Sequence, residues 1–459
     1  MEIIGWVYNL LWGDLITLPL PGGGTVGLSF LVILLIPAGI FFSIRLRFVQ
    51  LRLLPDMARA AIRKKGGSVK GSLSGLQTLI IATATRVGMG NLVGVVAAIS
   101  VGGAGAVFWM WVMAILGAAT AFAEAALVQM YKEKDPLYGG YRGTPARYID
   151  ACFGGKKRPG KRTIPAILFA LSGLICWCGI SQVISNSVSS AFETAFRIPP
   201  LWTTVVLVAL SAVIVLRKNA TVKVLDVLVP IMAGCYFLIT IVIICKNAGQ
   251  LPAVFSRIFE EAFGLRQAVG GGFGAVLMNG VKRGLFSNEA GSGSAPCAAA
   301  AADVSHPAEA GLLQAFGVFI DTIVICSCTA MIMLLAPAEN LAGLEGMGLL
   351  QAAMDYHMGQ FGVVFIALTL WMFSFSTFIG ILFYARPNVA YLFGDSWAAQ
   401  TAYKVVALVM LFIGGMAAYT FVWELGDVGI GLMTIFNMAA IVMLSGKAVS
   451  CLKEYESKQ

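Results

Sequence analysis

The chain has 459 residues, of which 58% are hydrophobic and only 12% are charged. A soluble domain carries about a quarter charged residues, so the composition excludes an ordinary soluble protein. Long apolar stretches recur along the whole chain, and each is long enough to cross the roughly 30 Å hydrocarbon layer of a bilayer. Because these stretches are continuously apolar, they predict membrane-spanning helices and not a β-barrel.

The apolar stretches predict an all-α integral membrane protein with about eleven transmembrane helices. The preceding segment 1–25 is short, and its residues Trp6, Tyr8 and Trp12 are typical of a segment that lies on the membrane surface. The approximate limits of the predicted spans are 26–47, 76–101, 105–131, 165–196, 200–216, 222–245, 268–302, 309–336, 360–385, 401–423 and 427–446.

The distribution of basic residues predicts the orientation of these spans. With the N-terminus outside, the inner segments hold 25 Lys and Arg residues and the outer segments hold 4. Cytoplasmic loops of membrane proteins carry such an excess. We therefore expect a multi-pass protein of the plasma (inner) membrane whose C-terminus is cytoplasmic. The net charge of +9 then follows from topology, and we expect no nucleic-acid partner.

Two of the predicted spans are interrupted. The second contains the string RVGMGN at 86–91, and the seventh contains FSNEAGSGSAP at 286–296. Glycine is a poor helix former, and a charge at the middle of the bilayer is costly. Both segments therefore predict discontinuous helices that face protein or water and not lipid.

The positions of the two interruptions predict an inverted repeat. Without the first span, the remaining ten divide into two sets of five, and each interrupted helix is the first of its set. Because five is odd, the two sets have opposite orientations, which is the pattern of a secondary transporter. The predicted domains are an N-terminal segment with the extra helix and a basic loop at 1–75, repeats at 76–246 and 247–446, and a cytoplasmic tail at 447–459.

The residues at the interruptions suit a zwitterionic amino acid and a sodium ion. The N-terminus of a half-helix favours a carboxylate, and free carbonyls favour a cation. Gly88 and Gly90 would let the backbone approach a ligand, or would serve tight helix packing. Asn91 is a candidate ligand for substrate and sodium, or a hydrogen-bonding link between helices. Ser287 and Asn288 are candidate ligands, Asn288 also for sodium, with packing as the alternative.

Polar residues on other spans complete the predicted site. Phe286 would wall the substrate pocket or simply pack. Ser376 and Thr377 are adjacent hydroxyls that could bind sodium, although such hydroxyls often bond to a carbonyl of their own helix. Gln182 lies four residues before Asn186 on one helix face, so it lines the cavity or links helices.

Arg86 and Glu289 lie beside the two interruptions. Charges at such depth are paired or functional. We interpret them as a charge pair that acts as a gate, with a purely structural salt bridge as the alternative.

The motifs are similar to those of a known family. The strings TRVGMGNLVGV at 85–95, GGAGAVFWMWVMAILGAATAFAEAAL at 102–127, RGLFSNEAGSGSAP at 283–296 and GVFIDT at 317–322 resemble the bacterial alanine or glycine:cation symporters, also called sodium:alanine symporters. The resemblance covers nearly the whole chain. It implies a leucine-transporter-like fold of 5+5 inverted repeats with two discontinuous helices. It also implies uptake of alanine, glycine or a relative with sodium, or less often with protons.

The resemblance also assigns residues. It places Gly88 and Asn91 at the substrate site and Phe286 on the pocket wall. Ser376 and Thr377 match the serine–threonine pair, followed by an aromatic residue, of the family's third-helix motif in the second repeat. The sequence departs from the family pattern at two positions.

Ile381 stands where many members have tryptophan, which implies a larger or differently shaped pocket. Ile184 stands where many have glutamine, with Gln182 two residues earlier as a possible replacement. The arginine of TRVGMGN resembles a branch in which glutamine is a plausible substrate.

We therefore predict a sodium-coupled symporter of a small neutral amino acid, with sodium as the coupling ion, no other metal and no cofactor. A glutamine-preferring or proton-coupled member of the same family is the alternative. A passive facilitator or channel is the alternative from another class. An enzyme is not expected, because the sequence has only two histidines and no metal-ligand cluster, nucleotide loop or nucleophile elbow. The sequence predicts no oligomeric state.

Overall fold

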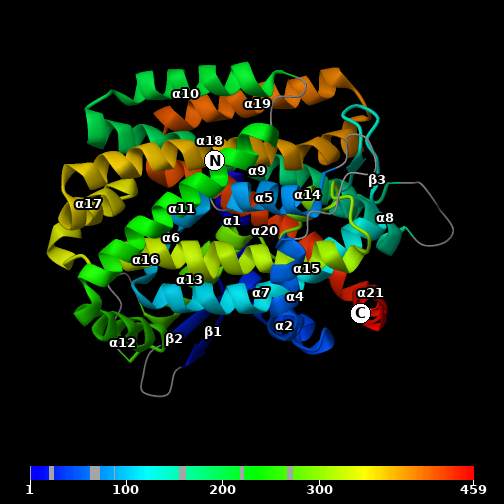
Figure 1. The fold of residues 1–459 in the computed structure, drawn as a ribbon, viewed down its shortest axis with the longest axis horizontal. Coiled ribbons are helices and arrows are strands. Elements are labelled where there is room, and N and C mark those ends of the chain that lie inside the picture. Colours follow the sequence, from blue (N-terminus) through cyan, green and yellow to red (C-terminus); the bar gives the residue numbers. More distant parts are fainter. Residues whose placement is uncertain are drawn as a thin grey trace.

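The structure is a computed structural model of the chain and describes residues 2–19, 25–62, 73–86, 88–154, 162–217, 222–265 and 272–458. Long helices pack side by side around a buried centre (Figure 1). Ten of the basic residues that the topology prediction counts lie outside the described residues: Arg63, Lys64, Lys65, Lys70, Lys156, Lys157, Arg158, Lys161, Lys218 and Arg266.

Each of the eleven stretches predicted as spans is helical in the described part of the chain. The helices are α2 (Phe30–Arg45), α5 (Gly75–Arg86) with η1 (Gly90–Gly94) and α6 (Val95–Gly102), α7 (Gly105–Met130), α9 (Ile164–Phe196), α10 (Pro200–Val215), α11 (Val222–Lys246), α13 (Phe273–Asn288) with α14 (Pro296–Ala299), α15 (Pro307–Val318) with η3 (Phe319–Cys326) and α16 (Ser327–Leu334), α18 (Gln360–Phe393), α19 (Trp397–Met416) and α20 (Tyr419–Met443).

Six helices of the described residues are long and apolar enough to cross a membrane, and a bent pair at 230–246 and 248–262 would make seven. Three further apolar helices are shorter. The protein is therefore a multi-pass membrane protein, and the total of eleven crossings stays a prediction.

Short elements connect the long helices, and the sequence analysis predicted none of them. Most are too short or too polar to show as apolar stretches. They are α1 (Glu2–Trp12), the antiparallel strands β1 (Asp14–Pro19) and β2 (Thr25–Ser29), α3 (Val49–Arg52), α4 (Leu54–Ile62), the paired strands β3 (Glu133–Lys134) and β4 (Tyr141–Arg142), α8 (Pro145–Phe153), η2 (Ala248–Gln250), α12 (Leu251–Ala262), η4 (Ala338–Leu341), α17 (Met347–Met358) and α21 (Ser445–Ser457).

The first of these elements corrects an expectation. Trp6 is 67% exposed, as expected for a residue at the membrane surface, but Trp12 is only 1% exposed. The Trp12 indole donates a hydrogen bond of 3.0 Å to the backbone carbonyl of Asp427 on α20. The segment therefore does not simply lie on the membrane, because its last turn is packed into the helix bundle.

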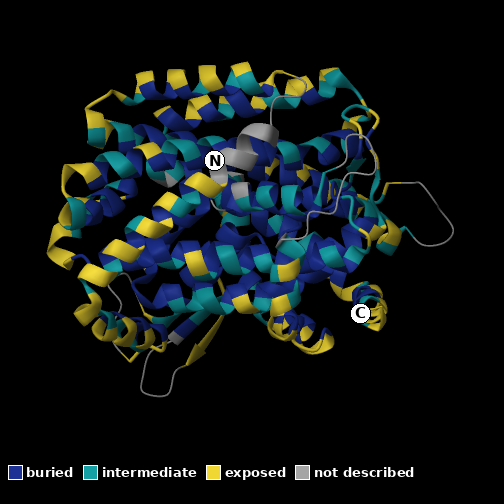
Figure 2. Cartoon of the chain, viewed as in Figure 1, coloured by how far each residue is buried: buried dark blue, intermediate teal, exposed yellow. Residues whose placement is uncertain are grey.

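Figure 2 shows that buried residues fill the centre of the bundle and that many exposed residues lie along its rim, for example on α10 and α12. Many of the exposed residues are large and apolar, such as Trp202 and Val213 on α10 and Leu238 on α11. In a soluble protein this rim would be an aggregation surface, whereas lipid is a suitable solvent for it.

Glycine lets the helices at the centre approach closely. A Cβ added to Gly179 on α9 would lie 2.3 Å from the backbone nitrogen of Gly426 on α20. A Cβ on Gly429 would lie 2.5 Å from the Cα of Cys176, and one on Gly414 of α19 would lie 2.2 Å from the Cα of Gln182. Without a hydrophobic force between helices in lipid, such close backbone packing holds them together.

We expect Gly179→Val to separate α9 from α20, because the added atoms meet backbone that has no rotamer to change. The free energy of unfolding should fall by about 1–3 kcal/mol or more, measured as a lower thermal unfolding midpoint in detergent. The matched control is Gly348→Ala, where an added Cβ meets nothing within 4 Å. Equal midpoints for both variants would contradict this account of the packing.

Candidate functional site

The first interruption lies between α5 and η1 and is held by Asn91. The Asn91 carboxamide is fully buried, and its Oδ1 accepts a hydrogen bond of 3.1 Å from the backbone N–H of Gly88. Its Nδ2 donates to the backbone oxygen and to Oδ1 of Asp321, at 2.9 and 2.8 Å. Asn91 therefore bonds to the unwound backbone and links it to η3. Val87, the preceding residue of the interruption, lies outside the described residues.

Asp321 joins the two interruptions. In addition to Asn91, its carboxylate accepts hydrogen bonds to Oδ2 from the hydroxyls of Ser287 on α13 and Thr322 on η3, at 2.8 and 2.7 Å. Asp321 is 0% exposed, so these bonds replace the water that a buried carboxylate needs. The stretch around it is a π-helix, a form frequent at functional sites. Sequence reasoning did not assign Asp321 to the site, although the GVFIDT motif contains it.

The second interruption needs backbone conformations that favour glycine. After α13 ends at Asn288, Glu289 has φ 57°, and Gly291 and Gly293 have φ 95° and 83°. The left-handed region is open to glycine but costs other L-residues roughly 1 kcal/mol. The positive φ angles thus explain why Gly291 and Gly293 occur in the AGSGS string. Asn288 Oδ1 accepts from the N–H of Ala290 at 3.0 Å, and its buried Nδ2 has no hydrogen-bond partner among the described residues.

Asn437 on α20 supports the second interruption, and sequence reasoning missed it. Its Nδ2 donates to the carbonyl of Gly291 at 2.9 Å and to the carboxylate of Glu124 on α7. Its Oδ1 accepts from the hydroxyl of Tyr148 on α8. A single asparagine in an apolar stretch gives little signal in the sequence, since its partners come from three other segments.

Phe286 lies between glycines of the first interrupted helix and of α20. Cβ atoms added to Gly90, Gly94 and Gly426 would lie 3.9, 3.7 and 4.0 Å from its ring. The ring is buried, and its centroid lies 5.0 Å from that of Trp423. Phe286 is therefore positioned directly beside the first interruption.

Of the adjacent hydroxyls on α18, that of Thr377 contacts the end of α5. Thr377 Oγ1 donates to the carbonyl of Thr85 at 3.4 Å and accepts from the N–H of Met89 at 3.3 Å. Ser376 Oγ donates to the carbonyl of Phe373 on its own helix at 2.8 Å. Gly380 allows the close approach, because a Cβ there would lie 2.0 Å from Thr85 Oγ1.

Ile381, one turn after Thr377, is fully buried in the central apolar core.

Gln182 lies apart from the interruptions. Its Nε2 donates a long hydrogen bond of 3.5 Å to the sulfur of Met410 on α19, and its Oε1 has no partner among the described residues. Asn186, one turn further, bonds to the carbonyls of Gly414 and Ala417 at 3.3 and 2.7 Å. Both side chains thus join α9 to the end of α19, which is the helix-linking alternative.

Arg86 and Glu289 are both buried but form no ion pair within 4.0 Å in the described residues. Arg86 Nη1 donates to the carbonyl of Gln314 at 3.3 Å. Within the part of the chain that the structure describes, Arg86 Nε and Nη2 and Glu289 Oε2 have no hydrogen-bond partner. The Arg86 charge still acts electrostatically on Glu124, Glu289 and Asp321. Arg86 is therefore a buried cation near three acidic residues, with no ion pair among the described residues.

Two cavities lie away from this cluster. One, of about 420 Å³, lies between the ends of α9 and α19 and the start of α20, and Asn186, Ser187, Glu193, Glu345 and Tyr419 line it among others. We call it the outer cavity, because the sequence predicts that these helix ends face the outside.

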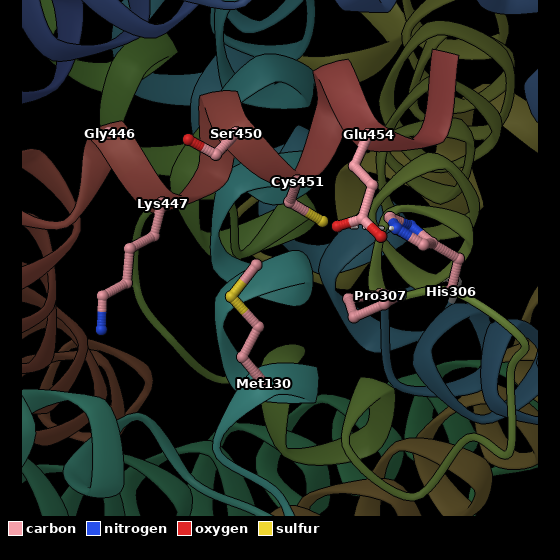
Figure 3. A pocket seen from close by; sticks show the side chains of 8 residues that line it. All are labelled: Met130, His306, Pro307, Gly446, Lys447, Ser450, Cys451 and Glu454. Atoms are coloured by element: carbon pink, nitrogen blue, oxygen red, sulfur yellow. Dashed lines mark ion pairs between the residues drawn. The ribbon is translucent and has the colours of Figure 1, made fainter. Parts of the chain in front are cut away.

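The other, of about 410 Å³, lies between α7, α15 and α21 and is drawn in Figure 3. There Glu454 faces His306, with 3.8 Å between the carboxylate and Nε2. A hydrogen bond from Lys458 holds the pKa of Glu454 below its usual value. None of the predicted site residues lines this second cavity.

Two interrupted helices that meet at a buried polar cluster inside a bundle of apolar helices define a secondary transporter. Comparisons with known proteins agree with this class of protein. Residues 23–459 match the model of the sodium:alanine symporter family, and the chain belongs to that family. It is a transporter and not an enzyme.

The chain is 39% identical over 455 residues to the "Probable sodium/glutamine symporter GlnT" of Bacillus subtilis, covering 99% of this chain and 90% of that protein. It is 35% identical over 461 residues to the "Sodium/alanine symporter AgcS" of Methanococcus maripaludis, with coverage of 99% and 97%.

The crystal structure of MhsT in complex with L-phenylalanine shares the fold, with a TM-score of 0.57 at 12% identity, covering 83% of this chain and 89% of that one. The fold is therefore leucine-transporter-like, as the sequence predicted.

We expect Asn437→Ala to destabilise the protein, because it leaves the Tyr148 hydroxyl, the Gly291 carbonyl and the Glu124 carboxylate without their partner. The expected loss is about 2–4 kcal/mol in the free energy of unfolding, measured by thermal unfolding in detergent. Asn247→Ala is the control, since the one side-chain hydrogen bond of Asn247 among the described residues goes to the carbonyl of Ile243 in the last turn of α11. A variant as stable as the wild type would show that Asn437 does not hold the second interruption.

Proposed function

We propose that this protein takes up a small neutral amino acid, alanine, glycine or a relative, together with sodium, by alternating access across the plasma membrane. The observation that carries the proposal is the meeting of Asn91 and Ser287, one from each interrupted helix, on the buried carboxylate of Asp321. A site built from both repeats changes when the repeats move relative to each other, which is what alternating access requires.

The substrate would bind where the interrupted helices touch. The backbone N–H groups of Gly88 and Met89 now bond to side chains, and they are suitable donors to a substrate carboxylate at the start of a half-helix. A substrate ammonium would replace the hydroxyl of Ser287 as a donor to Asp321. The ring of Phe286 beside Gly90 would cover the substrate's apolar part.

Sodium would bind to oxygen atoms of the same region. Thr377 Oγ1 and the Thr85 carbonyl lie 3.4 Å apart between α18 and α5, and a hard cation prefers such hydroxyl and carbonyl oxygens. Ser376, Asn91 and Asn288 supply further oxygens. A sodium ion between α5 and α18 would fix the first interruption and thereby prepare the substrate site.

Arg86 and Glu289 would pair in another state of the cycle. Each has side-chain atoms without a hydrogen-bond partner among the described residues, which is costly in a buried region. A movement of the two half-helices would bring them together, and the pair would then act as a latch.

The orientation of the protein follows from its charges. With 25 basic residues in the inner segments and 4 in the outer ones, the N-terminus would be outside and the C-terminus in the cytoplasm. The outer cavity at the ends of α9 and α19 then faces the medium.

Glutamine as the substrate and protons as the coupling ion are the alternatives within the family. A relative named for glutamine and another named for alanine are both similar to this chain. A passive facilitator remains the alternative from another class. Uptake of radiolabelled alanine, glycine and glutamine into proteoliposomes separates them. Accumulation above equilibrium that depends on an inward sodium gradient supports the proposal. Accumulation with a proton gradient alone would assign the coupling ion to protons, and equilibration without any gradient dependence would contradict symport.

We expect Asn91→Ala to lower sodium-dependent uptake at least tenfold, because the unwound backbone loses its partner at Gly88 and the link to Asp321.

Thr377→Ala should raise the sodium concentration for half-maximal uptake several-fold, since one oxygen ligand is lost. Thr369→Ala on the same helix is the control. An unchanged sodium dependence in Thr377→Ala would exclude this hydroxyl as a ligand.

Ile381→Trp tests substrate selection. The larger side chain would reduce the space beside Thr377, so uptake of glutamine should fall relative to alanine and glycine by about tenfold. The ratio of the kcat/KM values for glutamine and glycine is the measurement, with the thermal unfolding midpoint as a check on folding. An unchanged ratio in a folded variant would show that position 381 does not shape the pocket.

A further inference from the structure

A buried ion-pair cluster joins α13 to α20, about one helical turn before Phe286 on α13. Arg283 and Asp427 form two parallel hydrogen bonds of 3.1 Å. Lys282, the preceding residue on α13, has its Nζ 3.6 Å from the same carboxylate. Lys282, Arg283 and Asp427 are 5%, 6% and 1% exposed. Two cations therefore share one carboxylate, so that, among the residues that the structure describes, one positive charge of the cluster has no carboxylate of its own.

Helix α1 supplies a hydrogen-bond acceptor and two aromatic rings to the Lys282 ammonium. The Lys282 ammonium donates a hydrogen bond of 2.8 Å to the Tyr8 hydroxyl. It also lies 5.2 and 5.9 Å from the ring centroids of Tyr8 and Trp12, within reach of the cation–π attraction. The Trp12 indole bonds to the Asp427 carbonyl at 3.0 Å. Thus α1 contacts α13 through Tyr8 and α20 through Trp12, and it bridges the two helices.

The cluster lies between the outer cavity and the predicted pocket wall. The Arg283 guanidinium stacks 3.9 Å from the Trp423 ring centroid. The Trp423 ring lies 5.0 Å from that of Phe286 on one side and 6.3 Å from that of Tyr419 on the other. Tyr419 lines the outer cavity. Trp423 and the guanidinium stacked on it therefore lie between a ring that lines the outer cavity and the predicted pocket wall.

We propose that Lys282, Arg283, Asp427 and Trp423 form the outer gate of the transporter, and that α1 is the latch that holds this gate closed. The proposal rests on the alternating-access function and outside N-terminus proposed above. Helix α1 precedes residue 23, where the match to the family model begins. When α13 moves away from α20, Lys282 and Asp427 lose their bonds to Tyr8 and Trp12. Weakening these bonds therefore favours the open state.

Cys176 on α9 reports the opening without any need for transport. It is 0% exposed, and it packs against Gly429 of α20, two residues after Asp427. The experiment adds a membrane-impermeant maleimide to the outside of right-side-out vesicles in sodium-free buffer. Peptide mass spectrometry then measures the rate of labelling at Cys176 separately from the other cysteines.

We expect Tyr8→Phe and Trp12→Phe each to accelerate labelling of Cys176 by roughly fivefold, the factor that corresponds to one lost hydrogen bond. Both changes keep an aromatic ring on α1. Asp427→Asn, which removes the ion pair itself, should accelerate labelling at least as much. The matched control is Trp6→Phe on the same helix, whose side chain faces outward, and its rate should equal that of the wild type.

Faster labelling in Asp427→Asn alone would show a gate without a latch and would overturn the role of α1. Wild-type rates in all variants would overturn the gate as well. Where Trp12→Phe lowers the unfolding midpoint, Tyr8→Phe, which loses only a hydroxyl, decides the question. Because labelling is read without substrate or sodium, a failure to transport amino acids leaves this test unaffected.

Discussion

The structure depends on one constraint, which is that a backbone unwound inside the bilayer must find partners where no water is available. The first interruption meets it through the Asn91 carboxamide and the Thr377 hydroxyl, which accept from the N–H groups of Gly88 and Met89. The second meets it through Asn437, whose amide donates to the Gly291 carbonyl. Each of these partners is a neutral side chain that can exchange its bond for a ligand or an ion, so the same groups that satisfy the interruptions can form a binding site.

Asp321 is the point at which the two interruptions depend on each other. Its carboxylate receives Asn91 from the first repeat and Ser287 from the second. A charge in this position is costly unless it is fully bonded. A displacement of one interrupted helix removes a donor from Asp321 and favours a new arrangement of the other helix. This coupling is what the proposed symport needs, because a sodium ion between α5 and α18 must influence a substrate between the two interrupted helices.

Glycine has two separate tasks in this protein. At Gly179 and Gly429 it allows helix backbones to touch, with no space for a Cβ. At Gly291 and Gly293 it allows positive φ angles in the second interruption. The first task concerns packing in lipid, where small residues replace the hydrophobic force between helices. The second concerns local conformation, which only glycine adopts without strain.

The sequence by itself determined the class, the positions of the helices and the two interruptions, because apolar length and glycine clusters are local signals. The strings around Asn91 and Phe286 also identified the family. Only the tertiary structure decided which side chains meet. Asp321 and Asn437 became central because their partners come from distant segments, and Gln182 was found against α19 because helix rotation sets its direction. Trp12, expected at the membrane surface, proved to be buried, because the carbonyl that its indole needs belongs to a helix more than 400 residues later in the chain.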